Sequence, residues 1–450
     1  MSAERSAPSA GPIGQADRLE TVDVLRGFAL LGILPMNLPF FADTSAAFFN
    51  PALSGGFTGV NYALWLFGHV FFELKMMSIF SMLFGAGLIV MNERSAAAGR
   101  SLAAVYYRRI GWLLVIGLAH AYLLWYGDIL VTYALCGLAL YPLRRLKPLP
   151  LVALGAALLL TGMLVQFGLG LGFDFLRGMA DEVSHMTLQG ETPARWQRDA
   201  AEQWAEISAD FMPGAAALAA ERADYLQGGW DLFNRRAGES LSAQLEGFAF
   251  FSLWRAGGLM LIGMALMKSG FLRGALPSRV YALVAALGLS IGTPLIVWGA
   301  ARNQEANFDI VHMFTEGLLT NAVGSLLMML AYASLIALVC RSGALPALRR
   351  GLAGVGRMAL TNYLMQSVLC TTLFYGYGLG LFGALDRVGW WYVVLVIWAF
   401  QLGTSRLWLE HFRFGPAEWA WRSLTYWRVQ PMRIRPAQPR NERAVASSPG

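Results

Sequence analysis

Charged side chains are scarce in this chain of 450 residues. Asp, Glu, Lys and Arg make up only 14% of it, whereas apolar residues make up 56%. A soluble domain of this length needs a larger charged fraction to stay in solution. The composition therefore excludes an ordinary soluble protein and indicates a membrane protein.

Cysteine is also scarce, and familiar catalytic signatures are missing. Cys136, Cys340 and Cys370 lie in or beside apolar stretches without metal-ligand spacing, which excludes a disulfide framework and a thiolate metal site. No Walker A, GxSxG, HExxH or Rossmann motif occurs, and "GLGLGF" at 168–173 is typical of a glycine-rich helix end. We therefore expect no metal and no firmly bound cofactor.

Long apolar stretches recur along the chain. A helix needs about 20 residues to cross roughly 30 Å of hydrocarbon. The fourth stretch is short for this, and the second and eighth are longer than needed, which suggests tilt. The sequence predicts an all-α polytopic membrane protein with about ten transmembrane helices, at 22–41, 61–91, 107–126, 128–143, 150–172, 247–267, 280–300, 311–339, 358–382 and 388–409.

A polar stretch separates the fifth span from the sixth. The spacing of Trp196, Ala200 and Trp204 predicts amphipathic helices there, forming either a lid over the outer mouth or an inert insertion. The predicted division is a disordered cytoplasmic tail at 1–17, helices 1–5 in 18–172, an extracytoplasmic insertion at 173–246, helices 6–10 in 247–410 and a basic cytoplasmic tail with an interfacial helix at 411–450.

Loop charges predict the orientation, because short cytoplasmic loops collect Lys and Arg. With the N-terminus inside, the inner loops hold fourteen such residues and the short outer loops hold only Arg302 and Arg387. Both termini are then cytoplasmic. The net charge of +7 comes from these loops and from an Arg-rich C-terminal tail, which favours contact with membrane lipids rather than nucleic acid.

Several predicted spans contain ionisable side chains. A charge in hydrocarbon costs a few kcal/mol unless it faces a partner or water, so each such residue is a functional hypothesis. Helical rise and topology place these residues, and the neighbouring polar groups, in the outer half of the membrane. We expect one polar layer there, formed by Asn37, His69, Glu73, His120, Asp128, Arg255 and Glu316.

Two histidines in this layer each have a carboxylate nearby. His69 and Glu73 are four residues apart on one helix, which suits either a general base or a structural hydrogen bond. His120 precedes Asp128 across a tight turn, so Asp128 either orients His120 for catalysis or caps the next helix. Both alternatives stay open for each pair.

Arg255 requires anionic or carbonyl partners because a guanidinium does not lose its proton. We expect Glu73 or Glu316 to pair with it, unless a substrate carboxylate or phosphate takes that place.

A second polar set lies near the predicted cytoplasmic face. Arg26 pairs with the nearby Asp23 in our interpretation, and Asn362 begins the ninth span, where it binds substrate or bonds between helices. Glu418 and Arg422 are one turn apart, so they either pair in an interfacial helix or grip the phosphates of a donor.

Five ordered motifs resemble the YeiB-like family of bacterial inner-membrane proteins, which has no firmly assigned activity. The resemblance runs from end to end and implies a bacterial inner-membrane location. The motifs are "RLETVDVLRGFALLGILPMNLPFF" (18–41), "ELKMMSIFSMLFGAGL" (73–88), "IGLAHAYLLWYGDILVTYALCGLAL" (116–140), "GRMALTNYLMQS" (356–367) and "FGPAEWAWRSLTYW" (414–427).

The opening motif also resembles membrane acyltransferases that acetylate cell-envelope sugars and a lysosomal glucosaminide acetyltransferase. The shared Asp-x-x-Arg-Gly start corresponds to Asp23, Arg26 and Gly27. The sugar acetylases commonly have a His about ten residues further on, where this chain has Asn37. The resemblance implies acyl transfer from cytoplasmic acyl-CoA, with His120 or His69 as the base.

Three functional hypotheses follow. The first is an acyltransferase that moves an acyl group from acyl-CoA to an envelope sugar or lipid-linked acceptor, with Arg255 holding an anion and Arg26 near the donor entrance. The second is a secondary transporter of a small anionic solute or lipid-linked molecule, built from two inverted sets of five spans. The third is a sensor or scaffold whose outer insertion binds a partner.

Overall fold

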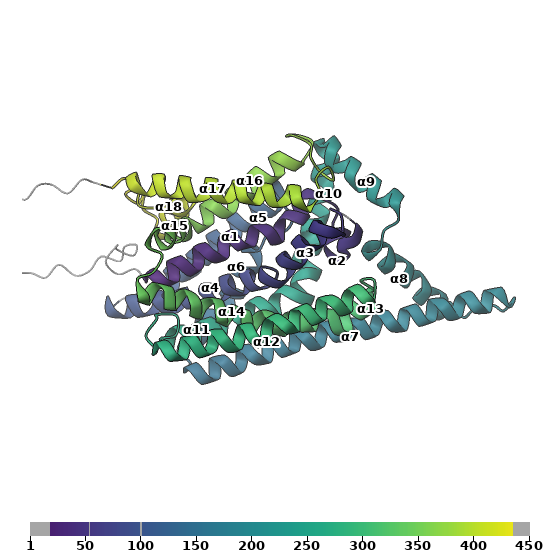
Figure 1. Cartoon of the computed structure of the whole chain (residues 1–450), viewed down its shortest axis with the longest axis horizontal. Helices are drawn as coiled ribbons and strands as arrows, with labels where there is room; N and C mark the ends of the chain where they lie inside the picture. Colours follow the sequence, from purple (N-terminus) through teal and green to yellow (C-terminus); the bar gives the residue numbers. More distant parts are fainter. Residues whose placement is uncertain (1–18, 54, 100, 435–450) are drawn as a thin grey trace, which may run out of the picture.

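The computed structural model describes residues 19–434 except 54 and 100, so the predictions for 1–17 and for the end of the C-terminal tail lie outside the described part. The described residues form a bundle of helices aligned along one axis (Figure 1). They contain no sheet, and a single isolated bridge pairs Phe412 with Arg433. The all-α prediction is confirmed. The elements are α1 (Glu20–Ala42), α2 (Ala46–Phe49), η2 (Pro51–Leu53), α3 (Gly59–Phe71), α4 (Lys75–Ala97), α5 (Ala103–Leu123), α6 (Leu130–Leu143), α7 (Pro148–Leu188), α8 (Arg195–Phe211), α9 (Ala215–Gln227), α10 (Gly229–Ser242), η3 (Ala243–Ser252), α11 (Leu253–Lys268), α12 (Ser278–Glu305), α13 (Ile310–His312), η4 (Met313–Gly317), α14 (Leu318–Ser342), α15 (Pro346–Arg357), α16 (Ala359–Phe374), α17 (Arg387–His411) and α18 (Pro416–Tyr426).

Seven stretches of the described helices are long and apolar enough to cross a membrane. They contain α1, α3 with α4, α7, α10 with η3 and α11, α12, α13 with η4 and α14, and α17. The remaining predicted spans correspond to α5, which has two arginines in its first turns, and to the shorter helices α6 and α16, of 14 and 16 residues. Each of the ten predicted segments is thus represented by helix.

The second predicted span is broken rather than only tilted. α3 ends at Phe71 and α4 begins at Lys75, with Leu74 between them in the left-handed region at φ 62°. A leucine there costs about 1–2 kcal/mol of backbone strain, so other contacts must hold the break in place.

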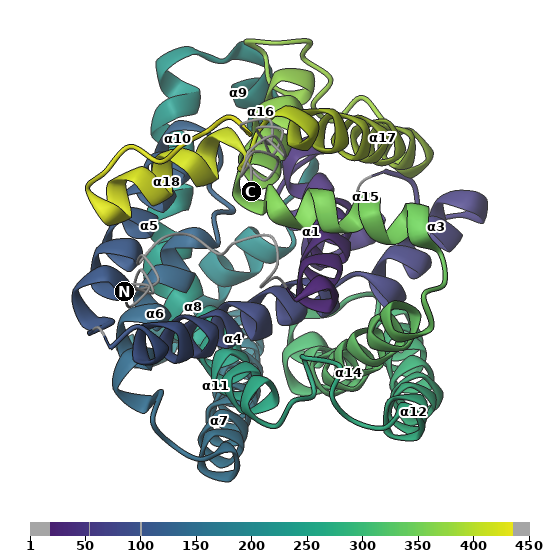
Figure 2. The same ribbon diagram turned by 90° about the vertical axis from the view of Figure 1, so that its left-hand side faces the viewer.

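α1 lies near the centre of the bundle when the molecule is viewed along its axis (Figure 2). Gly27 of α1 faces the backbone at Leu352, and Gly356 of α15 faces the carbonyl of Asp23, so that a Cβ at either glycine would meet main-chain atoms. The first and fourth sequence motifs therefore meet at a close crossing of α1 and α15, of the kind that small residues permit in membranes.

Two prolines lie inside α1. Pro35 has no N–H to donate to the carbonyl of Leu31, and the indole of Trp398 on α17 donates to that carbonyl instead, at 2.8 Å. The proline is thus tolerated because a neighbouring helix satisfies the freed oxygen.

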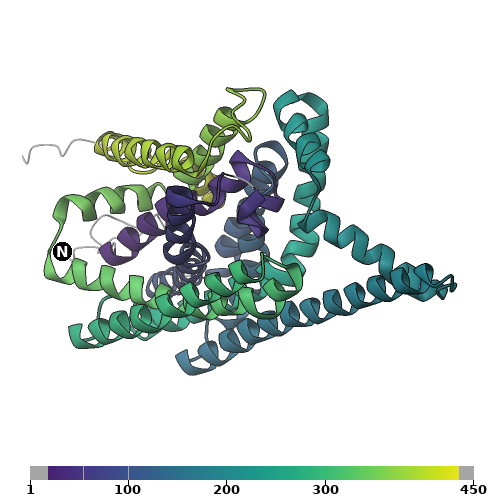
Figure 3. The same cartoon turned by 45° about the vertical axis from the view of Figure 1, so that its right-hand side comes forward.

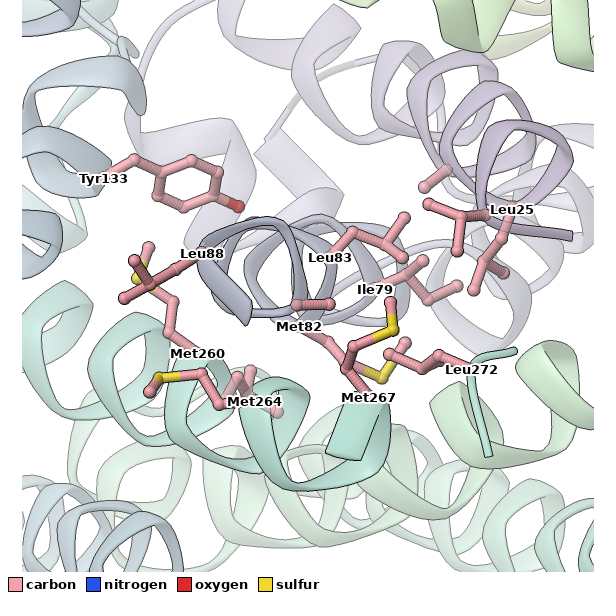
Figure 4. Close-up of a cluster of buried hydrophobic side chains, with 14 of the residues drawn as sticks. Leu25, Ile79, Met82, Leu83, Leu88, Tyr133, Met260, Met264, Met267 and Leu272 are labelled. Carbon is pink, nitrogen blue, oxygen red and sulfur yellow. The ribbon is translucent and has the colours of Figure 1, made fainter. Parts of the chain in front are cut away.

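An apolar cluster surrounds α4. Figure 4 shows Met82 and Leu83 of α4 between Leu25 of α1 and Met260 and Met264 of α11. α4 and α11 pack through reciprocal glycines, because a Cβ at Gly85 would meet the Met260 carbonyl and one at Gly263 would meet the Met82 carbonyl.

The insertion begins inside a long helix. α7 has 41 residues and runs straight through the predicted boundary at residue 172. Figure 3 shows it extending past the rest of the bundle before α8 turns back. Arg177 on α7 contacts Asp309, and Arg222 on α9 contacts the buried Asp43, so ion pairs join the insertion to the bundle. We call this the α9 end and the opposite one the α18 end (Figure 1).

Candidate functional site

His120 lies at the centre of a buried hydrogen-bonded relay. Its Nδ1 is 2.6 Å from Oδ2 of Asp128, and its Nε2 is 2.8 Å from the hydroxyl of Ser367 on α16. Both the imidazole and the carboxylate are 1% exposed. With Nδ1 protonated toward Asp128, Nε2 accepts the hydroxyl proton of Ser367, which is the order of groups found in serine–histidine–aspartate triads.

Asp128 also caps a helix. Its second oxygen, Oδ1, accepts a hydrogen bond from the backbone N–H of Val131 at 2.8 Å, in the first turn of α6. The predicted helix cap is therefore present, and the same carboxylate also contacts His120. A carboxylate fixed by the backbone on one oxygen holds the imidazole rigidly with the other.

Aromatic rings enclose this relay. The ring of Tyr363 lies 5.0 Å from that of His120, and the ring of Trp125 lies 6.4 Å away in an edge-on arrangement. The indole of Trp125 is buried and stacks on Phe41, yet its Nε1 has no hydrogen-bond partner within the described part of the chain. A donor without an acceptor is costly in such surroundings.

His69 and Glu73 form a second pair at the break between α3 and α4. Nδ1 of His69 is 2.8 Å from Glu73 Oε2, as the spacing predicted. The buried ammonium of Lys75 donates to the carbonyl of His69 and to Asn321 on α14, and Asn321 donates in turn to Glu73 at 2.9 Å. This network satisfies backbone oxygen freed where the helix stops, as membrane interiors require.

Arg255 donates to hydroxyls rather than to a carboxylate. Its guanidinium bonds Ser78 on α4 at 2.9 Å and Ser325 on α14 at 2.6 Å. Of the two predicted partners, Glu73 acts on it electrostatically without a direct contact among the described residues. The predicted pairing of Arg255 with Glu316 is wrong, since the Glu316 side chain is 52% exposed and lies 3.9 Å from Arg302 and from His312.

A small pocket opens beside His69, and its lining does not include His120. It has a volume of about 80 Å³. Apolar residues, among them three tryptophans and three prolines, line most of it, together with the polar side chains of His69, Glu73 and Arg387. The predicted polar layer therefore divides into two networks, and no hydrogen bond between them is found over residues 19–434.

Arginines gather at the α18 end. The guanidinium of Arg109 on α5 lies 3.6 Å from the centre of the Trp421 ring, and the charges of Arg26 and Arg422 act on it. Arg26 bonds Asp23 at 3.0 Å, as predicted. Three positive groups from α1, α5 and α18 thus lie close enough to act on one another electrostatically, and Asp23 neutralises part of this charge at Arg26.

Glu418 has a structural contact at the same end. Its carboxylate accepts backbone N–H bonds from Leu360 and Thr361 and the Thr361 hydroxyl, so it caps the first turn of α16. Burial raises the pKa of Glu418 even though these bonds favour its charged form. Glu418 thus caps α16, and the guanidinium of Arg422 lies over the ring of Phe414.

Asn362 is fully buried in a ladder between α16 and α17. Its side-chain amide donates to Ser405 at 2.9 Å, and Gln401 donates to its backbone carbonyl. Asn37 is half-buried on α1, between Met36 and Leu38, which both line the pocket. Neither residue meets the His120 relay in a hydrogen bond that the described structure records.

The sequence pointed to His120 and Asp128 but not to Ser367. Ser367 is the last residue of the "GRMALTNYLMQS" motif and lies 247 positions from His120. Serine is common in transmembrane helices, so its type and spacing gave no signal. Asn321, Arg109 and the role of Lys75 were missed for a similar reason, because their partners lie on distant helices.

The fold and these networks define a polytopic all-α membrane protein with ionisable groups bonded across its helices. Residues 266–428 match the family model described as "Protein of unknown function (DUF418)". The chain is 33% identical to "Uncharacterized protein YeiB" of Escherichia coli (strain K12) over 423 residues, covering 91% of this chain and 96% of that protein. The chain belongs to this YeiB-like family.

More distant relatives come from Bacillus. "Uncharacterized protein YxaH" of Bacillus subtilis (strain 168) is 29% identical, with 92% of this chain and 96% of that protein covered. A 39.9 kDa uncharacterized protein of Bacillus acidopullulyticus is 27% identical, with 94% and 98% covered. No solved structure matches the chain significantly.

Proposed function

We propose that this protein is an acyltransferase of the bacterial inner membrane. The observation that carries the proposal is the buried His120–Asp128 pair. The second nitrogen of His120, Nε2, lies 2.8 Å from the hydroxyl of Ser367. A fixed imidazole that receives a hydroxyl proton is the main requirement of acyl transfer to oxygen. His69 is the weaker candidate because its pair with Glu73 braces a helix break.

The donor end is the α18 end in this proposal. Arg26, Arg109 and Arg422 offer guanidinium groups of the kind that bind phosphates. Acyl-CoA carries several phosphates and is a cytoplasmic metabolite, which agrees with the loop charges that place this end inside. Both termini are cytoplasmic in this arrangement.

The acceptor enters from the α9 end. The pocket beside His69 offers the faces of Trp65 and Trp390 and the polar groups of His69 and Glu73, which suits a sugar hydroxyl of the envelope or of a lipid-linked precursor. The insertion formed by α8, α9 and α10 lies at this end, where it meets the acceptor first.

Transfer from labelled acetyl-CoA in proteoliposomes tests the proposal. We expect acetyl-CoA consumption and loss of transfer by about 10²–10⁴-fold in His120→Gln. Arg109→Gln raises the KM for the donor by about tenfold or more because a charge-assisted phosphate contact is lost. Arg406→Gln, an exposed arginine of α17, is the matched control. Absence of both binding and consumption of acyl-CoA contradicts the proposal.

One observation favours a second candidate, a secondary carrier. The break between α3 and α4 places a histidine, a carboxylate and an ammonium at a helix interruption, which is where many carriers bind solute. Flux of small anions into proteoliposomes tests it. Flux that persists in His120→Gln and stops in Lys75→Met supports carriage over acyl transfer.

A further inference from the structure

We infer that Ser367 is a catalytic nucleophile that carries the acyl group as a covalent ester between donor and acceptor. The inference rests on the proposed acyl transfer and adds to it an acyl-enzyme on α16, which makes the reaction a two-step exchange.

The first support is the order of the contacts. Asp128 binds one nitrogen of His120 at 2.6 Å, and Ser367 binds the other at 2.8 Å. The three side chains come from α5, from the α5–α6 turn and from α16, and Ser367 and His120 are 1% and 2% exposed. A serine that only stabilised the helix packing would more often bond a backbone carbonyl of its own helix, as Thr371 and Thr372 on α16 both do.

The second support is the indole of Trp125. It borders the His120 ring, it is 2% exposed, and its Nε1 has no acceptor anywhere in the described structure. Attack on an acyl carbonyl develops negative charge on oxygen, and such a site needs a fixed donor to receive it. The indole N–H of Trp125 is such a donor, and no acceptor occupies it in the described structure.

The chemistry balances with an acyl thioester as the co-reactant. Ser367 Oγ attacks the thioester carbonyl while its proton moves to His120 Nε2, and the carbon–sulfur bond then breaks as the thiolate takes that proton. An acceptor hydroxyl next gives its proton to His120 and attacks the Ser367 ester. The Ser367 oxygen leaves and regains the proton, so no oxidant or reductant is required.

One side chain of α1, Leu38, connects the surroundings of this relay to the pocket. Leu38 lines the pocket and also belongs to the buried cluster that contains Trp125 and Cys370. Leu38 lies between Pro35 and Pro39, two prolines that weaken the hydrogen bonding of α1 locally. Movement of this stretch joins the acceptor pocket to Ser367.

Two labelling reactions on the full-length protein in nanodiscs test the inference. A fluorophosphonate probe reacts with activated serines without any acyl donor, and [¹⁴C]acetyl-CoA forms the ester itself. We expect both labels on the peptide that contains Ser367, loss of both in Ser367→Ala, and labelling slowed by about 10²–10⁴-fold in Asp128→Asn. Ser405→Ala, which removes another fully buried serine, keeps both labels.

The outcomes separate the two proposals. Acetyl transfer at normal rate in Ser367→Ala, or a wild-type protein that transfers acetyl without either label on Ser367, overturns the nucleophile and leaves acyl transfer standing. Fluorophosphonate labelling of Ser367 without acetyl-CoA use supports the activated serine and overturns acetyl-CoA as donor. A wild-type protein with no label and no transfer overturns both. Ser367→Cys, labelled by an iodoacetamide reagent faster than Cys370, shows that a folded variant keeps the activated position.

Discussion

The two histidine–carboxylate pairs have the same chemical groups and different surroundings. His120 and Asp128 are 1% exposed, and the second nitrogen of His120 faces a hydroxyl. His69 and Glu73 are 11% and 22% exposed, lie beside a pocket, and are bound to Lys75 and Asn321 around a helix break. The comparison shows that the pair with the triad-like contacts is the buried one, whereas the pair beside the pocket is bound into a structural network.

We expect the largest difference between the two pairs when each carboxylate is replaced by the amide of the same shape. We expect Asp128→Asn to lower acyl transfer by about 10²–10⁴-fold, because the amide no longer stabilises the imidazolium or fixes its tautomer. Glu73→Gln should lower it by less than about tenfold, since it keeps the shape and one hydrogen-bond acceptor. Equal losses in steady-state transfer assays would show that both pairs act in the chemistry.

Loss of the lysine at the helix break tests the structural side of the comparison. Lys75→Ala leaves Glu73 without its cationic neighbour and the carbonyl of His69 unpaired, and should reduce the free energy of unfolding by about 3–5 kcal/mol. Lys268→Ala removes a half-buried lysine that also bonds two carbonyls and should cost about 1 kcal/mol. Thermal unfolding in detergent measures both, and a smaller loss for Lys75 than for Lys268 contradicts the bracing role.

The contacts of the site that could be predicted join residues close together in the sequence, whereas those that could not be predicted join distant residues. His120 and Asp128 are eight residues apart across a turn, so their contact followed from the chain itself. The contact between His120 and Ser367 spans 247 positions, and the cap that Glu418 provides for α16 spans up to 58. Helix packing alone brings residues so far apart in the sequence together.

The break at Leu74 escaped prediction for another reason. No glycine or proline occurs between Phe72 and Lys75, so the apolar pattern continues through it, and the left-handed turn is maintained by tertiary contacts. The all-α class was predictable because it depends on composition and on the length of apolar stretches.

The smallest expected effect concerns pH and the cap of the helix that carries Ser367. Burial raises the folded-state pKa of Glu418 above its ordinary value of 4.5. The folded protein then binds this proton more tightly than the unfolded chain, so stability falls as the pH rises from about 4.5 through the weakly acidic range. Glu418→Gln should flatten that decline, measured by unfolding between pH 4.5 and 7. An unchanged slope contradicts the assignment.

The length of α7 has a mechanical consequence. Its 41 residues extend about 60 Å, twice the roughly 30 Å of the hydrocarbon layer. A rotation of about 5° about the midpoint of a rigid helix of this length moves its tip by roughly 3 Å. A force on the junction with α8 would be transmitted to the bundle, to which α7 is tied by the ion pair between Arg177 and Asp309.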